Sequence, residues 1–492
     1  MDRRVAQGRP PSPPADAAPD PWSAPWLPLA IGIGFVVVAL VVYTVSDPIR
    51  VYNHFVWQAA AFLDGRAAID YPVAASGANH GNDFFQDVLP ILDSNGAPTG
   101  RGLIPFPPLP AVILMPFVAL WGLTTDDQLI AAILGAVDVG LAWWMLGRLG
   151  VRLGTRIAAT AFFGFGTVFW YTAQLGTTWY FAHVVAVGLA LGAVGIAIGR
   201  DPRSIGDDEE SEAAGDADAA ADRPRATRRD RILHLVDGPQ FLAGLLLGLA
   251  ATSRLTVILG APFFAFVGGG GSWPRRTFSA GLGAAIPVAG LLLYNVAATG
   301  SPVHPAYEYL YRQEALGYPT LDYHIEWGIE DARYIPQNFG IALLSTPAFF
   351  PDRVPAALGG DALCTQPGAT RGLFDKECPI AMPRDTGMSL LLSSPAWLLV
   401  IPALRGLYGR SRLVTGAGIA ILLIATANLM HFSQGWVQVG YRFSLDFVPF
   451  ALPLVALGAE RLRDRPRVVG GLVVVSIAIS LWGVVWGNLL GW

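Results

Sequence analysis

Two acidic residues near the start of the chain have the type and setting that acid–base chemistry needs. Asp47 follows the apolar run 27–46 directly, and Asp87 stands in NDFFQDVLP before an Asn-Gly turn signal. A carboxylate at the border of lipid and water can act as a general base on a bound hydroxyl, or help to hold a divalent cation. Alternatively, Asp47 caps a helix that begins at Pro48, and Asp87 is an ordinary solvated loop carboxylate.

Basic and polar side chains at the edges of other apolar runs could bind an anionic group. In QVGYRFSLDFVPF, Arg442 and Asp446 share one face if the segment is an α-helix. They then form a structural ion pair, or Arg442 binds a phosphate while Asp446 orients it. Arg254 marks a tight external turn, or it faces the bundle interior, where a guanidinium suits a phosphate. His183, one turn into an apolar helix, needs a polar partner, either as a site residue or as a bundle histidine.

The elements that must position these residues are membrane spans. The chain has 492 residues, 53% hydrophobic and 14% charged, and its apolar runs are long enough to cross a bilayer repeatedly. We therefore expect an all-α integral membrane protein with roughly 11–13 transmembrane helices, whose extracytoplasmic loops carry short amphipathic helices. The expected spans are 27–46, 105–122, 128–147, 154–171, 180–199, 239–253, 255–268, 277–297, 388–404, 413–430, 446–459 and 468–489.

Arginine clusters beside the spans indicate which ends face the cytoplasm. They lie at 148–156, 223–231, 275–276, 405–412 and 461–467. If the N-terminus is also inside, the first loop 46–104 and the long loop 298–387 are external. Counting back from the first cluster through two spans puts loop 46–104 inside instead. An odd number of crossings is therefore needed, with a re-entrant or split segment between 105 and 147.

This orientation divides the chain into four parts. Residues 1–26 form a Pro/Ala-rich cytoplasmic tail that we expect to be disordered, and residues 27–199 form an N-terminal transmembrane catalytic part. Residues 200–238 form a cytoplasmic linker of low complexity, and residues 239–492 form a C-terminal transmembrane part. We expect a multi-pass protein of the cell membrane whose active face is extracytoplasmic.

The second external loop has a composition that suits sugar binding. It is dense in Tyr, Trp and His and carries both signs of charge, so it can stack on a sugar and hydrogen-bond to it. The two cysteines of the chain, Cys364 and Cys378, both lie in this loop. In an oxidising compartment a disulfide closing about 15 residues would contribute about 3 kcal/mol. The alternative is two free thiols.

These features together resemble membrane-embedded glycosyltransferases of the GT-C superfamily. The resemblance rests on Asp47 after the first span, the surface helix leading to AFLDGR, the hairpin with Asp87 followed by PFPPLPAVILMPFVALWG, GTVFWYTAQLGTTWYFAH, the run Tyr294–Tyr307, SLLLSSPAWLLVIPALRGL and GWVQVGYRFSLDFVPF. It implies inverting transfer of a sugar from a polyprenyl-phosphate donor to a glycan, lipid or protein acceptor on the outer face. The base would be Asp47, with Asp87 as the second candidate. Members often show Asp-Glu or Asp-Asp in the first loop, whereas Pro48 follows Asp47 here, so either acid can be the base.

The resemblance also implies that basic and polar residues at the outer membrane border hold the lipid phosphate. Arg254 and Arg442 are the candidates for that contact. The full substrate-binding set that we expect at this face is His54, Asp83, His183, Arg254, Tyr307, Tyr334, Asn338, Trp436, Gln438, Arg442 and Asp446. Membrane lipids surround the chain, and a divalent cation is the cofactor considered.

Other classes of function have less support from the sequence. The net charge of -4 gives no basic face for nucleic acid. No nucleotide-phosphate loop, HExxH, GxSxG or metal-spaced Cys/His set occurs. A transporter or lipid flippase is the main alternative, and it predicts charged residues near span centres. A non-catalytic scaffold is the second alternative.

Overall fold

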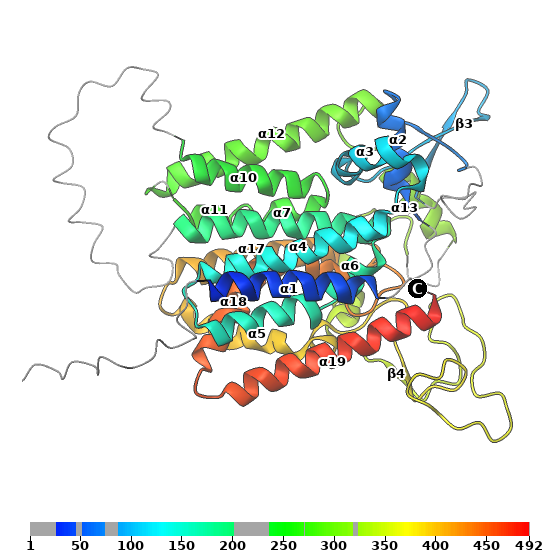
Figure 1. The fold of residues 1–492 in the computed structure, drawn as a ribbon. Coiled ribbons are helices and arrows are strands. Elements are labelled where there is room, and N and C mark those ends of the chain that lie inside the picture. Colours follow the sequence, from blue (N-terminus) through cyan, green and yellow to red (C-terminus); the bar gives the residue numbers. More distant parts are fainter. Residues whose placement is uncertain are drawn as a thin grey trace, which may run out of the picture.

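Helices dominate the fold and run side by side as a bundle (Figure 1). The computed structural model describes residues 26–45, 52–73, 87–200, 236–269, 271–317 and 323–491. Six helices within these ranges are long and apolar enough to cross a membrane: α1 (Leu27–Thr44), α4 (Asp127–Gly147), α7 (Thr178–Arg200), α12 (Trp273–Thr299), α17 (Arg412–Met430) and α19 (Pro466–Leu490). The expectation of an all-α membrane protein is confirmed, whereas the number of 11–13 crossings stays a prediction.

Shorter helices complete the bundle. They are α5 (Leu153–Phe165), α6 (Phe169–Leu175), α10 (Gly238–Ala251), η4 (Leu255–Gly260), α11 (Phe263–Phe266), η8 (Pro395–Leu399), α16 (Val400–Ala403), η9 (Leu404–Leu407) and α18 (Val448–Arg461). Several begin with or contain proline, which interrupts the backbone hydrogen bonds of a long helix. Their buried side chains join those of α4 and α7 in one large apolar core.

Glycine residues allow helices α10 and α12 to pack very closely against each other. A Cβ atom on Gly244 would lie 1.9 Å from the carbonyl oxygen of Ala280, and one on Gly248 would lie 2.5 Å from that of Ala284. Lipid tails are as apolar as the helices, so helix association in a membrane depends on this kind of close packing. Because α10 leads into Arg254, the contact helps to fix the position of that residue.

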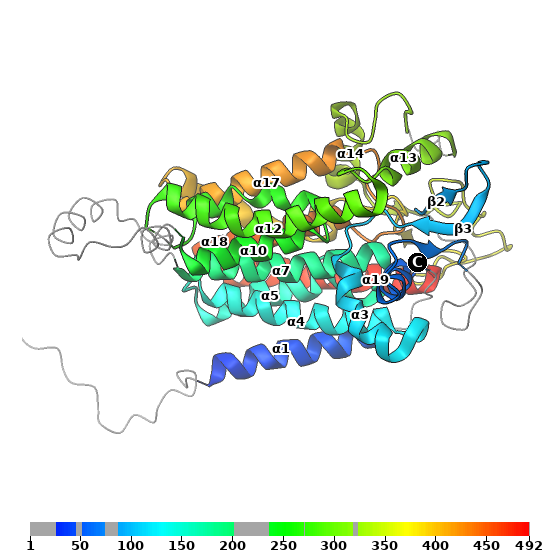
Figure 2. The ribbon, with the colours of Figure 1, turned by 90° about the horizontal axis from the view of Figure 1, so that it is seen from above.

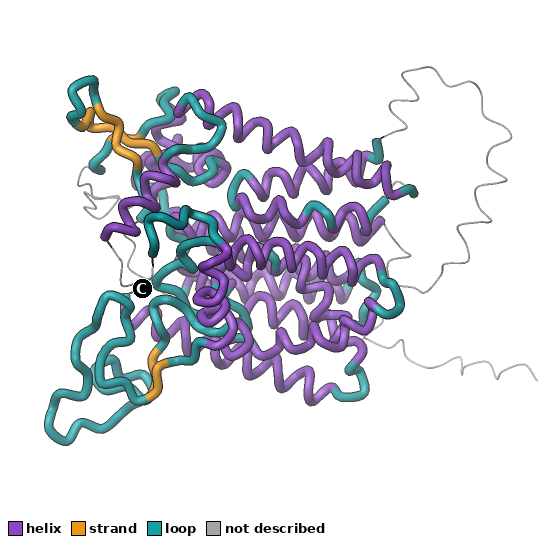
Figure 3. Tube along the Cα trace, turned by 180° about the vertical axis from the view of Figure 1, so that it is seen from behind, coloured by secondary structure: helices purple, strands orange, loops and turns teal. Residues whose placement is uncertain are grey.

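The described strands and several short helices lie together at one end of the bundle, which we call the loop end (Figures 1 and 3). It comprises α2 (His54–Leu63), α13 (Ala306–Gly317), α14 (Ile335–Phe339) and an antiparallel sheet of strand order β1-β3-β2. The strands are β1 (Ile69–Asp70), β2 (Leu89–Leu92), β3 (Pro98–Leu103) and, in a separate hairpin, β4 (Ala348–Phe349) and β5 (Ala381–Met382). The described parts of the two predicted external loops therefore fold on the same side.

Helix α3 (Leu109–Trp121) lies in the region 105–147, where the sequence requires an odd number of crossings. It lies at the loop end beside α2 in both views (Figures 1 and 2). The backbone N–H of Leu109 donates to the carbonyl of Thr252, just after α10. Leu114 and Val118 pack with residues of α2 and of the first turns of α4 and α7. If the loop end lies outside the bilayer, α3 is the segment between 105 and 147 that does not cross.

Arginines gather at the opposite end, which we call the arginine end. Arg152 binds Glu460 at 2.7 Å and so joins the start of α5 to the end of α18. Arg461 donates to the carbonyl of Pro402 at 2.8 Å. The predicted tail 1–26 and linker 200–238 lie almost entirely outside the described residues.

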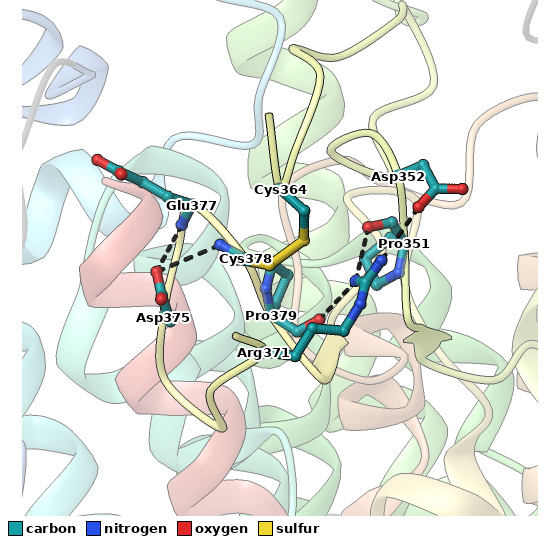
Figure 4. The surroundings of a disulfide bond; sticks show 8 residues. All are labelled: Pro351, Asp352, Cys364, Arg371, Asp375, Glu377, Cys378 and Pro379. Atoms are coloured by element: carbon teal, nitrogen blue, oxygen red, sulfur yellow. Dashed lines mark hydrogen bonds and ion pairs between the residues drawn. A yellow bond between two sulfur atoms is a disulfide. The ribbon is translucent and has the colours of Figure 1, made fainter. Parts of the chain in front are cut away.

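A disulfide joins Cys364 and Cys378 in the loop between β4 and β5 (Figure 4). Beside it, Arg371 donates to the carbonyl of Pro379 at 2.9 Å and pairs with Asp352 at 3.0 Å. The segment between β4 and β5 contains little regular structure. The disulfide and the contacts of Arg371 therefore stabilise it, as backbone hydrogen bonds stabilise the helices of the bundle.

We expect Gly244→Ala to destabilise the protein by about 1–3 kcal/mol, because the added methyl group meets the backbone of α12 and not a movable side chain. The measurement is the thermal unfolding temperature of the purified protein in detergent. Gly281→Ala is the matched control on α12, since its Cβ would have no atom within 4 Å. Equal unfolding temperatures of the two variants would contradict the packing argument.

Candidate functional site

Asp87 lies half-buried at the loop end, where the first loop meets the start of α7. Its Oδ2 accepts a hydrogen bond from Nε1 of Trp179 at 2.9 Å. Its φ of 59° is in the left-handed region, which is strained for most residues but tolerated by Asp. Burial raises the pKa of Asp87 to about 6, although the bond from Trp179 and the charge of Arg442 both act to lower it. A carboxyl group with this pKa is ionised at neutral pH and still basic enough to take a proton.

Aromatic rings surround the hydrogen bond to Asp87. The ring of Trp179 lies 5.1 Å from that of Tyr52, 5.7 Å from that of His54 and 6.3 Å from that of Phe106, measured between centroids. Nδ1 of His54 is 2.9 Å from the hydroxyl of Thr178, the first residue of α7. His54 therefore anchors α2 to α7 and helps to hold Trp179 against the carboxylate.

Asp446 is the centre of a second polar cluster inside the bundle. Its carboxylate is fully buried and accepts two hydrogen bonds from Arg254, at 3.0 and 3.1 Å. Thr256 donates to it at 2.7 Å and Asn428 at 3.3 Å. Nδ1 of His183 lies 3.2 Å from its other oxygen. Residues of α7, α17 and the segment after α10 thus converge on one carboxylate.

The expected pair of Arg442 with Asp446 is wrong. The segment Arg442–Asp446 forms a 3₁₀ helix, η10, in which residues four apart do not share a face as they do in an α-helix. The carboxylate of Asp446 instead accepts a hydrogen bond from Arg254, which is 192 residues away in sequence. Of the two readings of Arg254, the structure supports the one that turns it toward the bundle.

Arg442 is buried without a carboxylate bonded to it among the described residues. Only 7% of its surface is exposed, and its Nε has no hydrogen-bond acceptor there. The guanidinium lies over the rings of Tyr180, at 4.9 Å, and Phe443, at 5.5 Å. Arg254 lies over the same Phe443 ring at 5.1 Å. The two arginines therefore flank one aromatic ring.

Tyr307 lies within electrostatic reach of both Asp87 and Arg254. Burial raises its pKa to about 12, while Arg254 acts to lower this pKa and Asp87 acts to raise it. The charges of Asp87, Arg254 and Arg442 are thus close enough to influence one another's surroundings. We therefore treat Asp87, Trp179, Tyr307, Arg254 and Arg442 as one candidate site at the loop end.

Other residues of the expected set form the scaffold of the site. Gln438 is fully buried, accepts the backbone N–H of Arg442 at 2.9 Å and donates to the carbonyl of Gln434 at 2.8 Å. The ring nitrogen of Trp436 donates to Asp385 at 2.8 Å. Both residues therefore hold the chain around Arg442.

Gly435 leaves space for the guanidinium of Arg442 because glycine has no Cβ atom. Its φ is +85°, and a Cβ there would lie 2.7 Å from Nε of Arg442.

Tyr334 and Asn338 lie within the fold of the second loop. The hydroxyl of Tyr334 is 3.3 Å from that of Tyr311, and Asn338 donates to the carbonyls of Leu429 and His431. These contacts join the loop to the end of α17. Asp47 and Asp83 lie outside the described residues.

Sequence reasoning missed several residues of the site: Trp179, Thr256, Asp385, Asn428 and Gly435. In the sequence, Trp179 is indistinguishable from an interfacial anchor, because a ring at a span border has that role in most membrane proteins. The other four are small or polar residues in unremarkable settings, and no signal marks them before the fold is known.

Comparison with known proteins gives no family assignment. Neither a scan against protein-family models nor a search of curated proteins finds a match. Two solved structures of an archaeal oligosaccharyltransferase, AglB from Archaeoglobus fulgidus, are similar to this chain. One is tethered to an acceptor peptide containing the NVT sequon, and the other is in complex with an inhibitory peptide and a dolichol-phosphate.

The similarity covers almost the whole of this chain, but the sequence identity and the TM-score are low. The first structure is 11% identical with a TM-score of 0.43 and covers 96% of this chain. The second is 12% identical with a TM-score of 0.41 and covers 95%. The chain spans 55% and 56% of the length of those proteins. AglB belongs to the GT-C superfamily, which the sequence motifs resemble, but a likeness of this strength assigns no activity to any residue here.

We expect Asp446→Asn to destabilise the protein by about 3 kcal/mol, the lower end of the cost of breaking a buried ion pair, because it leaves the partly exposed guanidinium of Arg254 without a compensating charge. Thermal unfolding in detergent measures the effect. Asp352→Asn is the control: it removes an exposed ion pair with Arg371 and should leave the unfolding temperature nearly unchanged. If the two variants unfold alike, Asp446 is not the centre of the bundle's polar cluster.

Proposed function

We propose that the protein is a membrane glycosyltransferase that moves a sugar from a polyprenyl-phosphate donor to a glycan, lipid or protein acceptor. One observation carries the proposal. At the loop end, a buried guanidinium without a bonded carboxylate among the described residues, that of Arg442, lies within electrostatic reach of a half-buried carboxyl group, that of Asp87, whose pKa is raised to about 6. The first suits a phosphate, and the second suits a base for an acceptor hydroxyl or amide.

The reaction moves one proton and one electron pair. Asp87 takes the proton from the acceptor, and the freed acceptor atom bonds to the anomeric carbon of the sugar. The bond from that carbon to the phosphate oxygen breaks, and its electron pair leaves with the lipid phosphate. Attack from the side opposite the leaving group inverts the anomeric centre. Negative charge thus moves from Asp87 toward Arg442 during the step, and the arginine binds the transition state more strongly than the ground state.

We further propose that the loop end faces the outside of the cell. The arginines of the opposite end support this orientation by the positive-inside rule. The Cys364–Cys378 disulfide supports it as well, since such bonds persist in oxidising compartments. A site at the membrane border lets the polyprenyl tail stay in lipid while the sugar meets an acceptor in water.

A divalent cation stays part of the proposal. In the described part of the chain, no group of three or more His, Cys, Asp or Glu side chains could hold an ion. An ion near Asp87 would therefore need Asp47 or Asp83 as a further ligand. Sugar transfer that is lost in EDTA and restored by Mg²⁺ or Mn²⁺ would support the ion, and full transfer in EDTA would exclude it.

A transporter or flippase is the second candidate, and one residue favours it. Asp138 lies in the middle of α4, is only 4% exposed, and its Oδ2 has no hydrogen-bond partner among the described residues. A carboxyl group at such a depth is the kind of residue that transporters use. Loss of lipid transport in Asp138→Asn, with sugar transfer absent from the wild type, would favour this candidate.

We expect Asp87→Asn to lower the rate of sugar transfer by about 10²–10⁴-fold, the usual contribution of a general base. The assay follows labelled sugar from polyprenyl-phosphate donors in nanodiscs. Asp70→Asn is the control, because that exposed carboxylate lies in β1 of the sheet whose strand β2 follows Asp87, and it should keep the wild-type rate. Full transfer by Asp87→Asn would show that another group, such as Asp47, is the base.

The wild-type rate should also depend on pH. Because the base must be ionised and the pKa of Asp87 is about 6, transfer should be constant above pH 7 and fall as the pH drops through 6. A rate that stays constant down to pH 4.5 would contradict this assignment, since a carboxyl group at its ordinary pKa would behave in that way.

A further inference from the structure

The segment from β4 to β5, residues 348–382, is attached to the end of a membrane span. Its Leu363 and Met382 form one apolar cluster with Trp486, which lies near the end of α19 and is fully buried. Helix α19 is long and apolar enough to cross a membrane, and its exposed side chains, such as Val474, face lipid. The β4–β5 segment therefore begins at the border between the bilayer and water.

The β4–β5 segment extends sideways from this border. In Figures 1 and 3 it projects past the end of α19 and beyond the outline of the helix bundle. The bilayer occupies the space beside the bundle, so a segment in this place lies over the lipid headgroups and not over the other helices.

Four large apolar side chains of the segment are exposed, and we call them the apolar tip. They are Phe349 and Phe350, each 61% exposed, Leu373, 52% exposed, and Phe374, 44% exposed. They lie on neighbouring stretches of backbone, because the N–H of Phe350 donates to the carbonyl of Ile380 at 2.8 Å and that of Ile380 donates to the carbonyl of Gly372 at 2.9 Å. Exposed apolar side chains that gather in this way mark an interaction surface.

Cross-links hold the apolar tip in its exposed position. The disulfide of Cys378 with Cys364 closes the stretch that contains Leu373 and Phe374 (Figure 4). Asp375 accepts the backbone N–H of Cys378 at 3.2 Å. Because the stretch is cross-linked, the tip cannot bury its side chains by local collapse. Their contact with water is removed only when something else covers them.

The charges of the segment do not select a charged partner. It contains three basic residues and four acidic ones, and Arg371 pairs with Asp352 at 3.0 Å. The guanidinium of Arg371 also lies 5.9 Å from the centre of the Phe350 ring. Apolar rings beside charges of both signs match the headgroup level of a membrane, where an amphipathic surface has its apolar part in lipid and its polar part in water.

We propose that the apolar tip docks on the lipid surface at the loop end, with its rings among the headgroups and the upper acyl chains. Lipid is the occupant because the tip continues the lipid-facing surface of α19, from which the segment projects. Aromatic rings are favourable at this level, and the cross-linked backbone needs no reordering to place them there. The inference is independent of the reaction proposed above, since it concerns the position of the protein in the membrane.

Docking of the apolar tip fixes the height of the candidate site relative to the bilayer. Asp385, just after β5, accepts a hydrogen bond from the ring nitrogen of Trp436 at 2.8 Å. Gln438 donates to the carbonyl of Thr386 at 3.1 Å and accepts the backbone N–H of Arg442 at 2.9 Å. The chain that leaves the tip is thus hydrogen-bonded to the chain around Arg442, so the bilayer positions both together.

Photo-cross-linking to lipid tests the inference. The photoreactive residue p-benzoylphenylalanine replaces Phe350 or Phe374, whose phenyl ring it retains, in the full-length protein. The variants are irradiated in phosphatidylcholine nanodiscs, and lipid adducts are measured by mass spectrometry. Replacement of Val474 on α19 is the positive control. Replacement of Leu92 is the matched negative control, because this apolar side chain is 54% exposed on β2, in a hairpin that points away from the helices (Figure 2).

We expect phosphatidylcholine adducts at positions 350 and 374, as at position 474, and no adduct at position 92. A second substitution tests whether the tip docks as a unit. Phe374→Asp, which puts a charge at the lipid border, should lower the adduct yield at position 350, whereas Phe374→Leu should keep it. Unfolding temperatures establish that each variant is folded.

Three results would overturn the inference. The first is the absence of lipid adducts at positions 350 and 374 while position 474 reacts, because the tip then lies in water. The second is an equal adduct yield at position 92, because the reagent then reports chance contacts with lipid. The third is an adduct of positions 350 and 374 with protein in place of lipid, because the tip then binds a polypeptide or a second copy of this chain.

Discussion

The fold at the loop end depends on the burial of one carboxylate, that of Asp446. A charge in the interior of a membrane bundle is tolerated only when other groups compensate it, and four side chains do so here. They come from α7, from α17 and from both sides of the start of η4. Because these segments lie far apart in the chain, the carboxylate fixes their relative positions in a way that non-directional apolar packing does not.

The pairing of Asp446 with Arg254 has a consequence for Arg442. With the neighbouring acid already engaged, Arg442 has no carboxylate bonded to it among the described residues, while the rings of Tyr180 and Phe443 and the backbone at Gly435 surround its guanidinium. Gln438 and the contact of Trp436 with Asp385 tie this arrangement to the second loop. Two arginines that share the ring of Phe443 thus have different surroundings: Arg254 is paired with a carboxylate, and the phosphate contact that we propose falls to Arg442.

The two halves of the chain make the site together. Asp87 and Trp179 come from the N-terminal half, whereas Arg254, Tyr307 and Arg442 come from the C-terminal half. Helix α10 packs against α12, and α3 lies at the loop end beside α2 with a backbone hydrogen bond to Thr252. These contacts hold the two halves of the chain next to each other. The proposed base and the proposed phosphate contact therefore come together only when both halves are folded.

The membrane-spanning class, the location of the polar loops and the chemical types at the candidate site could be predicted from the sequence, because long apolar runs and isolated charges at their edges are local features. The sequence marked Asp87, Arg254 and Arg442 but not their partners. The folded chain was needed to show that Asp446 binds Arg254 and not Arg442, that α3 packs beside α2 at the loop end, and that Asp87 accepts a hydrogen bond from Trp179. Such pairings depend on which segments meet in space, and sequence neighbours do not reveal that. A 3₁₀ turn at Arg442–Asp446 is enough to separate neighbours that an α-helix would have joined.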